Sequence, residues 1–181
     1  MSAYNIVLFI HLLGALALFA AFTIEGLSIR GLRAAKSLED LRTWLAAARK
    51  SGPLALFAVL AILLGGGYLA GRLHAWGQGW IQVSLGLVVL IGAIGAPLTA
   101  PRLRAIRSLV LAPASDSFAT ASSRAHASFF LVSFDLRVAF AVAAVFLMST
   151  KIELLPSLVV VAVAIVLAVI AAMIHRSRSS S

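Results

Sequence analysis

Five apolar runs, each long enough to form a helix across a bilayer, dominate this chain of 181 residues. A helix needs about 20 residues to cross the hydrocarbon core of a membrane. Inside that core every backbone polar group must be bonded within the protein, which a helix achieves by itself. We therefore predict an all-α fold, a polytopic bundle that forms one transmembrane domain over residues 1–181, with five helices at 4–29, 53–71, 80–100, 127–149 and 155–174.

The composition agrees with a membrane environment. Hydrophobic residues make up 62% of the chain and charged residues 12%, whereas soluble domains are about half apolar and about a quarter charged. A water-soluble protein of this length could not bury so much apolar surface. The chain has no cysteine, which excludes disulfides, thiolate metal sites and iron–sulfur clusters.

The distribution of Lys and Arg predicts the orientation, because short cytoplasmic loops carry an excess of these residues. Arg72 and Lys151 fall on one side of the predicted bundle, and Arg137 falls inside a run. The other side carries Arg30, Arg33, Lys36, Arg42, Arg49, Lys50, Arg102, Arg104, Arg107, Arg124, Arg176 and Arg178. We therefore expect an outer N-terminus and a cytoplasmic C-terminus in a bacterial cytoplasmic membrane.

The formal net charge of +9 is explained by the same distribution. The basic residues lie in short segments between apolar runs, where they can contact anionic lipid headgroups. We expect membrane lipids as partners and no nucleic acid.

Two connections are long enough to have structure of their own. In segment 37–50, Ser37 and Asp40 have the spacing of a capping box, and apolar residues recur on one helical face. We expect a cytoplasmic interfacial helix that ends at Gly52 and Pro53, with a solvated linker helix as the alternative. The connection at 101–126 is rich in Ser and Ala, and we expect it to be partly flexible.

Ionisable side chains inside the runs are the first candidates for function, because each costs about 2.5–3.5 kcal/mol at the centre of a membrane helix. Glu25 lies in the first run and Arg137 in the fourth, which is antiparallel to it. An Arg side chain can reach several ångströms toward the interface, so we predict an intramembrane ion pair between the two. The pair could fix the register of the helices or take part in the passage of protons or anions.

Three further polar residues accompany Arg137 in or beside the fourth run. His126 and Ser133 share its helical face, whereas Asp135 lies about 200° away around the helix. We interpret Asp135, Ser133 and His126 as a polar pore or as packing contacts.

His11 is the most specific candidate ligand, because an imidazole in an apolar half-span can bind haem or a metal. The outer-side companion for such a site is His74, which follows the second run. The alternative is a hydrogen bond from the His11 ring to a neighbouring carbonyl or hydroxyl group.

Gly67 and Gly71 have the GxxxG spacing that lets helices approach closely in a bilayer. Packing within the chain and contact between two copies both remain open.

Three stretches, at 9–15, at 65–71 leading to 79–81, and at 146–151, resemble a bacterial family of integral membrane proteins of unknown function. That family is similar to the CopD-like copper-resistance membrane domain and to membrane protoporphyrinogen oxidase of the HemJ type. The resemblance implies that His11 corresponds to a first-helix histidine that binds haem or copper in the relatives.

The sequence contains no nucleophile elbow, phosphate-binding glycine loop or HExxH zinc motif. We therefore expect a non-enzymatic membrane protein, either an accessory subunit with a membrane protein or a second copy as its partner, or a small-solute transport component. The alternative function is a membrane redox protein that binds haem b or copper at His11.

Overall fold

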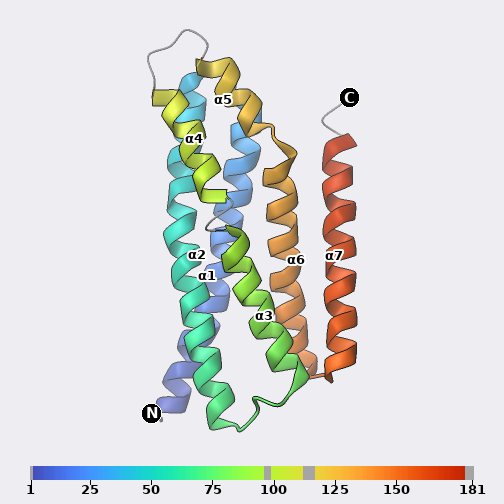
Figure 1. Cartoon of the computed structure of the whole chain (residues 1–181). Helices are drawn as coiled ribbons and strands as arrows, with labels where there is room; N and C mark the ends of the chain where they lie inside the picture. Colours follow the sequence, from blue (N-terminus) through green and yellow to red (C-terminus); the bar gives the residue numbers. More distant parts are fainter. Residues whose placement is uncertain (1, 96–98, 112–116, 178–181) are drawn as a thin grey trace.

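The computed structural model describes residues 2–95, 99–111 and 117–177, and this part of the chain has helices and no strands (Figure 1). Four stretches are long and apolar enough to cross a membrane, namely α1, α2, α7 and the stretch Phe118–Thr150 that contains α6. The helices in chain order are α1 (Ala3–Ala34), α2 (Leu38–Arg72), α3 (Gly79–Ile94), α4 (Ala100–Leu111), α5 (Ser117–Ala125), α6 (Ser128–Thr150) and α7 (Leu154–Ser177).

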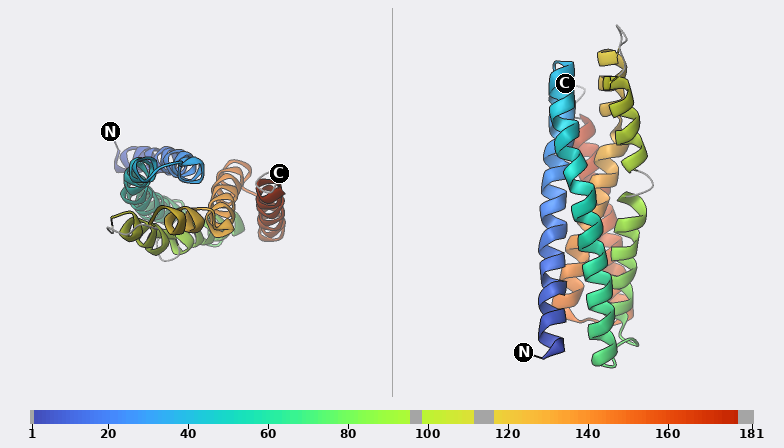
Figure 2. Two further views of the ribbon diagram at one scale, coloured as in Figure 1. Left: turned by 90° about the horizontal axis from the view of Figure 1, so that it is seen from above. Right: turned by 90° about the vertical axis from the view of Figure 1, so that its left-hand side faces the viewer.

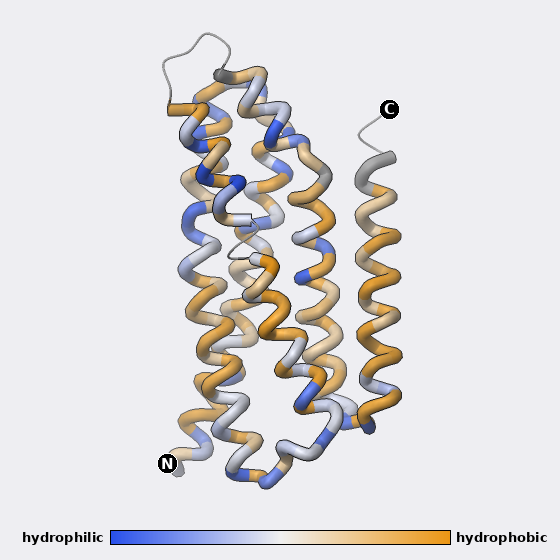
Figure 3. Tube along the Cα trace, in the orientation of Figure 1, coloured by the Kyte–Doolittle hydropathy of each residue, from blue (hydrophilic) through white to orange (hydrophobic). Residues whose placement is uncertain are grey.

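The helices form an elongated bundle with two distinct ends. Figure 1 shows the N-terminus, the turn between α2 and α3, and the turn between α6 and α7 at one end, which we call the N-terminal end. The turn between α1 and α2, together with α4 and α5, lies at the opposite end, which we call the α5 end. Hydrophilic residues gather at both ends, whereas the middle is mostly hydrophobic (Figure 3).

The third apolar run forms a shorter helix than predicted. We expected a helix at 80–100, but α3 ends at Ile94 and has 16 residues. It therefore rises about 24 Å, less than the roughly 30 Å of a hydrocarbon core. Residues 96–98 lie outside the described part of the chain, and α4 begins at Ala100.

The predicted break at Gly52 and Pro53 is wrong, because α2 runs through both residues as one helix of 35 residues. Packing on either side of the proline compensates for its missing hydrogen bond. Before it, Trp44 lies against Gly31 of α1, and after it Ala61 lies against Gly14. The second apolar run therefore does not form a separate helix from the segment before it.

The N-terminus of α2 does have the predicted capping box. The hydroxyl of Ser37 accepts the backbone N–H of Asp40 at 3.0 Å, and the Asp40 carboxylate accepts the backbone N–H of Ser37 at 3.1 Å. The apolar face that follows packs on protein rather than facing outward, since Leu41, Leu45 and Ala48 are buried.

The connection expected to be partly flexible is helical over most of its length, as α4 and α5. Residues 112–116 lie outside the described part. Alanine is the strongest helix former, and Ala121 and Ala125 pack in a buried cluster. The other members of that cluster are Ile29, Leu32, Leu41, Leu45, Ile106, Val110 and Phe130.

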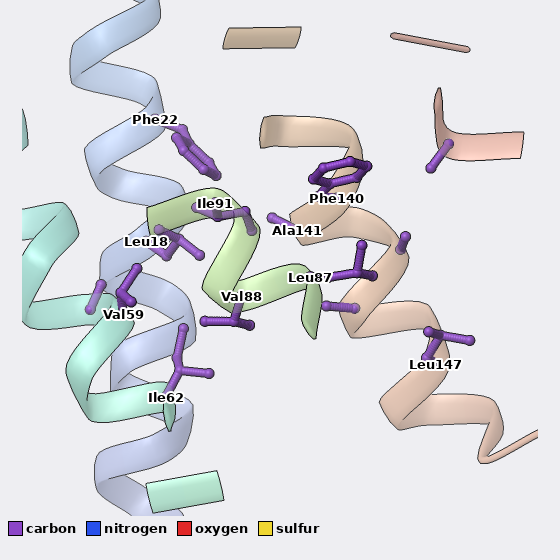
Figure 4. Close-up of a cluster of buried hydrophobic side chains, with 14 residues drawn as sticks. Leu18, Phe22, Val59, Ile62, Leu87, Val88, Ile91, Phe140, Ala141 and Leu147 are labelled. Atoms are coloured by element: carbon purple, nitrogen blue, oxygen red, sulfur yellow. The ribbon is translucent and has the colours of Figure 1, made fainter. Parts of the chain in front are cut away.

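A second and larger hydrophobic cluster lies in the middle of the bundle (Figure 4). Leu18 and Phe22 reach it from α1, and side chains of α2, α3 and α6 close it from the other sides. The labelled members from those helices are Val59, Ile62, Leu87, Val88, Ile91, Phe140, Ala141 and Leu147.

The last helix, α7, stands at the edge of the bundle (Figure 2). Ala164, Ala168 and Ala172, spaced four residues apart, form its buried stripe. Small residues at this spacing let two membrane helices approach closely. Apolar side chains such as Leu155 and Val159 are exposed on α7, at 76% and 62%, as expected for a helix that faces lipid.

Candidate functional site

The structure brings Glu25 of α1 and Arg137 of α6 together in a buried ion pair. The Nη1 of Arg137 donates to Oε2 of Glu25 at 3.0 Å, and Nη2 donates to Oε1. Both residues are buried, with 6% of Glu25 and 4% of Arg137 exposed. A bidentate pair of this kind is the geometry in which guanidinium and carboxylate interact most strongly.

The two partners meet at the same depth because their helices are antiparallel. Glu25 lies nine residues before the end of α1 at Ala34, and Arg137 lies nine residues after the start of α6 at Ser128. Each is therefore about 14 Å from the α5 end of its helix. The pair joins two helices that make few other contacts with each other.

Neighbouring groups complete the surroundings of the guanidinium. Its Nε donates to the backbone oxygen of Ser133 at 3.1 Å, and its Cζ lies 5.7 Å from the ring centroid of Phe22. Gly95, the residue after α3, leaves room for it, because a Cβ there would lie 3.2 Å from Nη1. Every nitrogen of the Arg137 side chain therefore has a partner or a close neighbour.

The remaining polar residues of α6 do not all join this pair. The Ser133 hydroxyl forms a buried hydrogen bond with the hydroxyl of Thr99 at 3.3 Å. Asp135 is half-buried. His126 is exposed at the turn before α6, where its Nδ1 donates to the backbone oxygen of Ser122 at 2.9 Å. The three residues therefore do not lie together. His126 is in the turn before α6, and Ser133 and Asp135 lie on different faces of α6.

A pocket of about 250 Å³ lies between α1, α2 and α3 at the N-terminal end of the bundle. Its lining is mostly apolar and includes the rings of Tyr4, Trp76 and Trp80. The rest of the lining is Leu8, His11, Leu12, Ile62, Gly66, Gly67, Leu69, Ala70, Leu73, Ile81, Ser84, Leu85, Val88 and Met148. An apolar pocket with a few polar groups is typical of small-molecule sites.

His11 is held in this pocket by α2. Its Nδ1 lies 3.1 Å from the backbone oxygen of Ile62, and because a carbonyl only accepts, Nδ1 is the donor. Gly65 and Gly66 leave room for this side chain. A Cβ on Gly65 would lie 3.1 Å from Cβ of His11, and a Cβ on Gly66 would lie 3.1 Å from Cε1 of its ring. In the neutral ring, Nε2 then carries the lone pair.

Ser84 of α3 is a further polar side chain of the pocket, and our reading of the sequence did not single it out. Its exposed fraction is 0%, and its Oγ has no hydrogen-bond partner among the described residues. Of the other buried serines, Ser28 and Ser51 bond to their own helices, as Ser28 does to the backbone oxygen of Ile24 at 2.7 Å, and Ser133 bonds to Thr99. The sequence feature that could have indicated Ser84 was its helical spacing from Leu87, Val88 and Ile91, with which it forms the buried stripe of α3.

His74, the expected companion of His11, does not line the pocket. It is exposed in the turn after α2, with a φ of 51°. Met148 of α6 does line the pocket. Among the described residues, no group of three or more His, Cys, Asp or Glu side chains could hold a metal ion.

The GxxxG face of α2 is covered from within the chain. A Cβ on Gly67 would lie 3.7 Å from Cη2 of Trp76, and a Cβ on Gly71 would lie 3.5 Å from its Nε1. Of the two readings, packing within the chain accounts for this face.

Comparison with protein-family models, with curated protein sequences and with solved structures gives no match.

Proposed function

We propose that this chain is a five-span protein of a bacterial cytoplasmic membrane that binds a small apolar solute, as a non-enzymatic component of solute uptake or handling. The pocket between α1, α2 and α3 is the observation on which the proposal rests. It combines apolar walls with the polar side chains of His11 and Ser84. Binding of an apolar molecule buries its surface, and the polar groups select its orientation.

The proposed topology has the N-terminus outside and the C-terminus in the cytoplasm. The helix ends at the N-terminal end of the bundle carry Arg72 and Lys151. The α5 end carries the basic residues of the α1–α2 turn, α4 and α5. The excess of positive charge supports a cytoplasmic α5 end, which puts the pocket in the outer half of the membrane. The fifth span in this proposal is α3 with the residues that follow it.

Single cysteines test the topology directly, because the chain has none of its own. Gly77→Cys lies in the exposed turn between α2 and α3, and Lys36→Cys lies in the exposed turn between α1 and α2. In intact cells, a membrane-impermeant maleimide should label the first and not the second. Labelling of Lys36→Cys in intact cells would refute the orientation.

Tryptophan fluorescence tests the solute site. The chain has three tryptophans, and Trp76 and Trp80 line the pocket. In a Trp44→Phe background, bromobenzene should quench the two pocket tryptophans in a saturable manner, because a bound heavy atom quenches on contact. Ser84→Leu fills the pocket and should remove the saturable component. If quenching is unsaturable, or is equal in both proteins, the pocket does not bind apolar solutes.

The second candidate function is a redox protein with a metal bound at His11, as the resemblance to CopD-like and HemJ-type domains implies. The hydrogen bond from Nδ1 to Ile62 supports it, since metal-binding histidines commonly donate their other ring N–H to a carbonyl. Met148 would supply a soft sulfur ligand, which suits Cu(I). The pocket volume is below the roughly 300–1,000 Å³ of sites for drug-sized ligands, so the residues fit a copper ion better than the large ring of haem b.

Metal analysis and visible absorption of the purified protein separate the two functions. The redox function requires about one copper per chain, or a Soret band for haem, that is lost in both His11→Ala and Met148→Leu. The solute-binding function requires neither signal and predicts that Met148→Leu still binds bromobenzene.

A further inference from the structure

We infer that the pocket selects apolar molecules that carry a hydroxyl group, such as phenols and fused-ring or terpenoid alcohols. This inference rests on the proposed solute-binding function and adds the chemical class of the solute. It rests on the unpaired hydroxyl of Ser84 and on the His11 ring, whose Nδ1 already donates to Ile62. The two side chains line the same pocket from two different helices.

Ser84 contributes a hydroxyl that its own helix does not use. Among the described hydroxyl side chains within helices, Ser28, Ser51, Ser149 and Ser157 all donate to a backbone oxygen three or four residues earlier, at 2.7–2.9 Å. Ser84 makes no such bond, although it is fully buried. A buried hydroxyl without a partner costs free energy, and a ligand oxygen that accepts from Ser84 removes this cost.

His11 contributes an acceptor. Its Nδ1 donates to the backbone oxygen of Ile62, so the neutral ring presents a lone pair on Nε2. The hydrogen bond to Ile62 also fixes the orientation of the ring. A ligand that donates to His11 and accepts from Ser84 satisfies both side chains, and a hydroxyl is the smallest group that does both. Ketones and ethers only accept, and hydrocarbons do neither.

The walls of the pocket set the size and character of the rest of the molecule. An apolar cavity of about 150 Å³ holds benzene, so a pocket of about 250 Å³ accommodates a molecule of one to two rings. The rings of Tyr4, Trp76 and Trp80 favour an aromatic ligand, because aromatic pairs gain energy beyond their buried area.

The rim of the pocket indicates the route of entry. Leu12, Leu73 and Trp76 line the pocket and are 54%, 58% and 48% exposed. An apolar rim of this kind opens toward the hydrocarbon phase of a membrane, where apolar alcohols accumulate. The ligand therefore enters sideways from the lipid.

The test compares three probes that share one ring system, 1-naphthol, 1-methoxynaphthalene and naphthalene. Binding to the full chain in detergent is measured by isothermal titration calorimetry. Wild-type protein should bind 1-naphthol about 3- to 10-fold more tightly than either of the others, the range expected for one or two net hydrogen bonds. Comparison among variants in the same detergent cancels the unequal partition of the probes into micelles.

Four variants locate the preference. Ser84→Ala keeps the pocket and should lower the preference for 1-naphthol over naphthalene. Its melting temperature should equal or exceed that of wild type, because no hydrogen bond is lost within the protein and an unpaired buried hydroxyl is removed. His11→Asn keeps a donor for the Ile62 oxygen and lacks the Nε2 acceptor, so it should lose the preference for 1-naphthol over 1-methoxynaphthalene. Ser28→Ala, a buried serine outside the pocket, should keep it. Ser84→Leu should bind none of the probes.

The outcomes separate the inference from the proposed function. If the three probes bind wild type equally, or if Ser84→Ala keeps the full preference over naphthalene, the inference is wrong while the solute-binding function stands. If no probe binds, or if Ser84→Leu binds them as wild type does, the proposed function fails as well.

Discussion

Arg137 on α6 holds Glu25 on α1 with both of its terminal nitrogens, so one ion pair joins residues that are 112 positions apart in the sequence. Both side chains are buried, and removing one leaves the other charged and uncompensated. Arg137→Leu should therefore lower the free energy of unfolding by about 3–5 kcal/mol. Glu25→Leu combined with Arg137→Leu should recover part of this loss, because neither charge then remains buried.

Thermal melts in detergent measure these changes. Arg33→Leu is a matched control, since the partly exposed Arg33 side chain donates a hydrogen bond to the backbone oxygen of His126 at 3.0 Å and its loss should change stability by less than about 1 kcal/mol. A double variant no more stable than Arg137→Leu would mean that the two charges do not depend on each other.

Gly95 provides the space in which the Arg137 guanidinium lies. A Cβ at this position would be 3.2 Å from Nη1, closer than a methyl group normally packs. Gly95→Ala should destabilise the protein, by about 1 kcal/mol. Gly92→Ala, three residues earlier, would place its Cβ 3.6 Å from Val59, which is ordinary contact, and should be neutral or slightly stabilising. Equal melting temperatures for the two variants would show that the guanidinium moves without cost.

The approximate positions of α1, α6 and α7, and the ion pair, could be predicted from sequence for one physical reason. A membrane helix must satisfy its backbone locally, so its ends follow from the length of an apolar run, and α7 at Leu154–Ser177 differs little from the predicted 155–174. The fixed rotation and rise of such a helix then relate residues on it to one another. This helical geometry, together with the antiparallel direction of α1 and α6, puts Glu25 and Arg137 at the same depth.

The continuity of α2 and the pocket could not be predicted in this way. Whether a helix survives Pro53 depends on the contacts of Trp44 and Ala61 with α1, which are remote in sequence. Ser84 becomes a candidate only when its hydroxyl is seen to lack a partner in its own helix. His11 and Ser84 lie on different helices, and the sequence around each residue does not indicate that their buried faces line one pocket.

Gly31 of α1 leaves room for the Trp44 ring of α2. A Cβ on Gly31 would lie 2.0 Å from Cδ2 of Trp44, so the ring must move if Gly31 is replaced. Gly31→Ala should destabilise the protein by about 1–3 kcal/mol, and Trp44→Leu in the same chain should restore part of the loss. Gly52→Ala is the matched control, because nothing lies within 4 Å of its Cβ, and it should stabilise α2 by about 0.5–1 kcal/mol. A Gly31→Ala protein that melts like wild type would contradict the close packing of α1 on α2.

His74 could either end α2 or bind a cofactor together with His11, and a substitution distinguishes these two roles. It ends α2 in a left-handed conformation with a φ of 51°. Its N–H donates to the Gly71 oxygen at 3.2 Å, and the N–H of Ala75 donates to the Ala70 oxygen at 2.9 Å. These two bonds form a Schellman motif, in which glycine is the preferred residue at the position of His74. His74→Gly should therefore stabilise the protein by about 0.5–1 kcal/mol, a rise of about 1–4 °C in melting temperature for a chain of this size.

Two controls make this result specific. Lys151→Gly replaces the other non-glycine residue with a positive φ in the described part of the chain and should give a rise of similar size. His74→Ala should not, because alanine has a Cβ that disfavours the left-handed region. If His74 is instead a ligand together with His11, then His74→Gly should lower the bound metal or haem content. Unchanged content with a raised melting temperature assigns His74 to the end of α2 rather than to a cofactor.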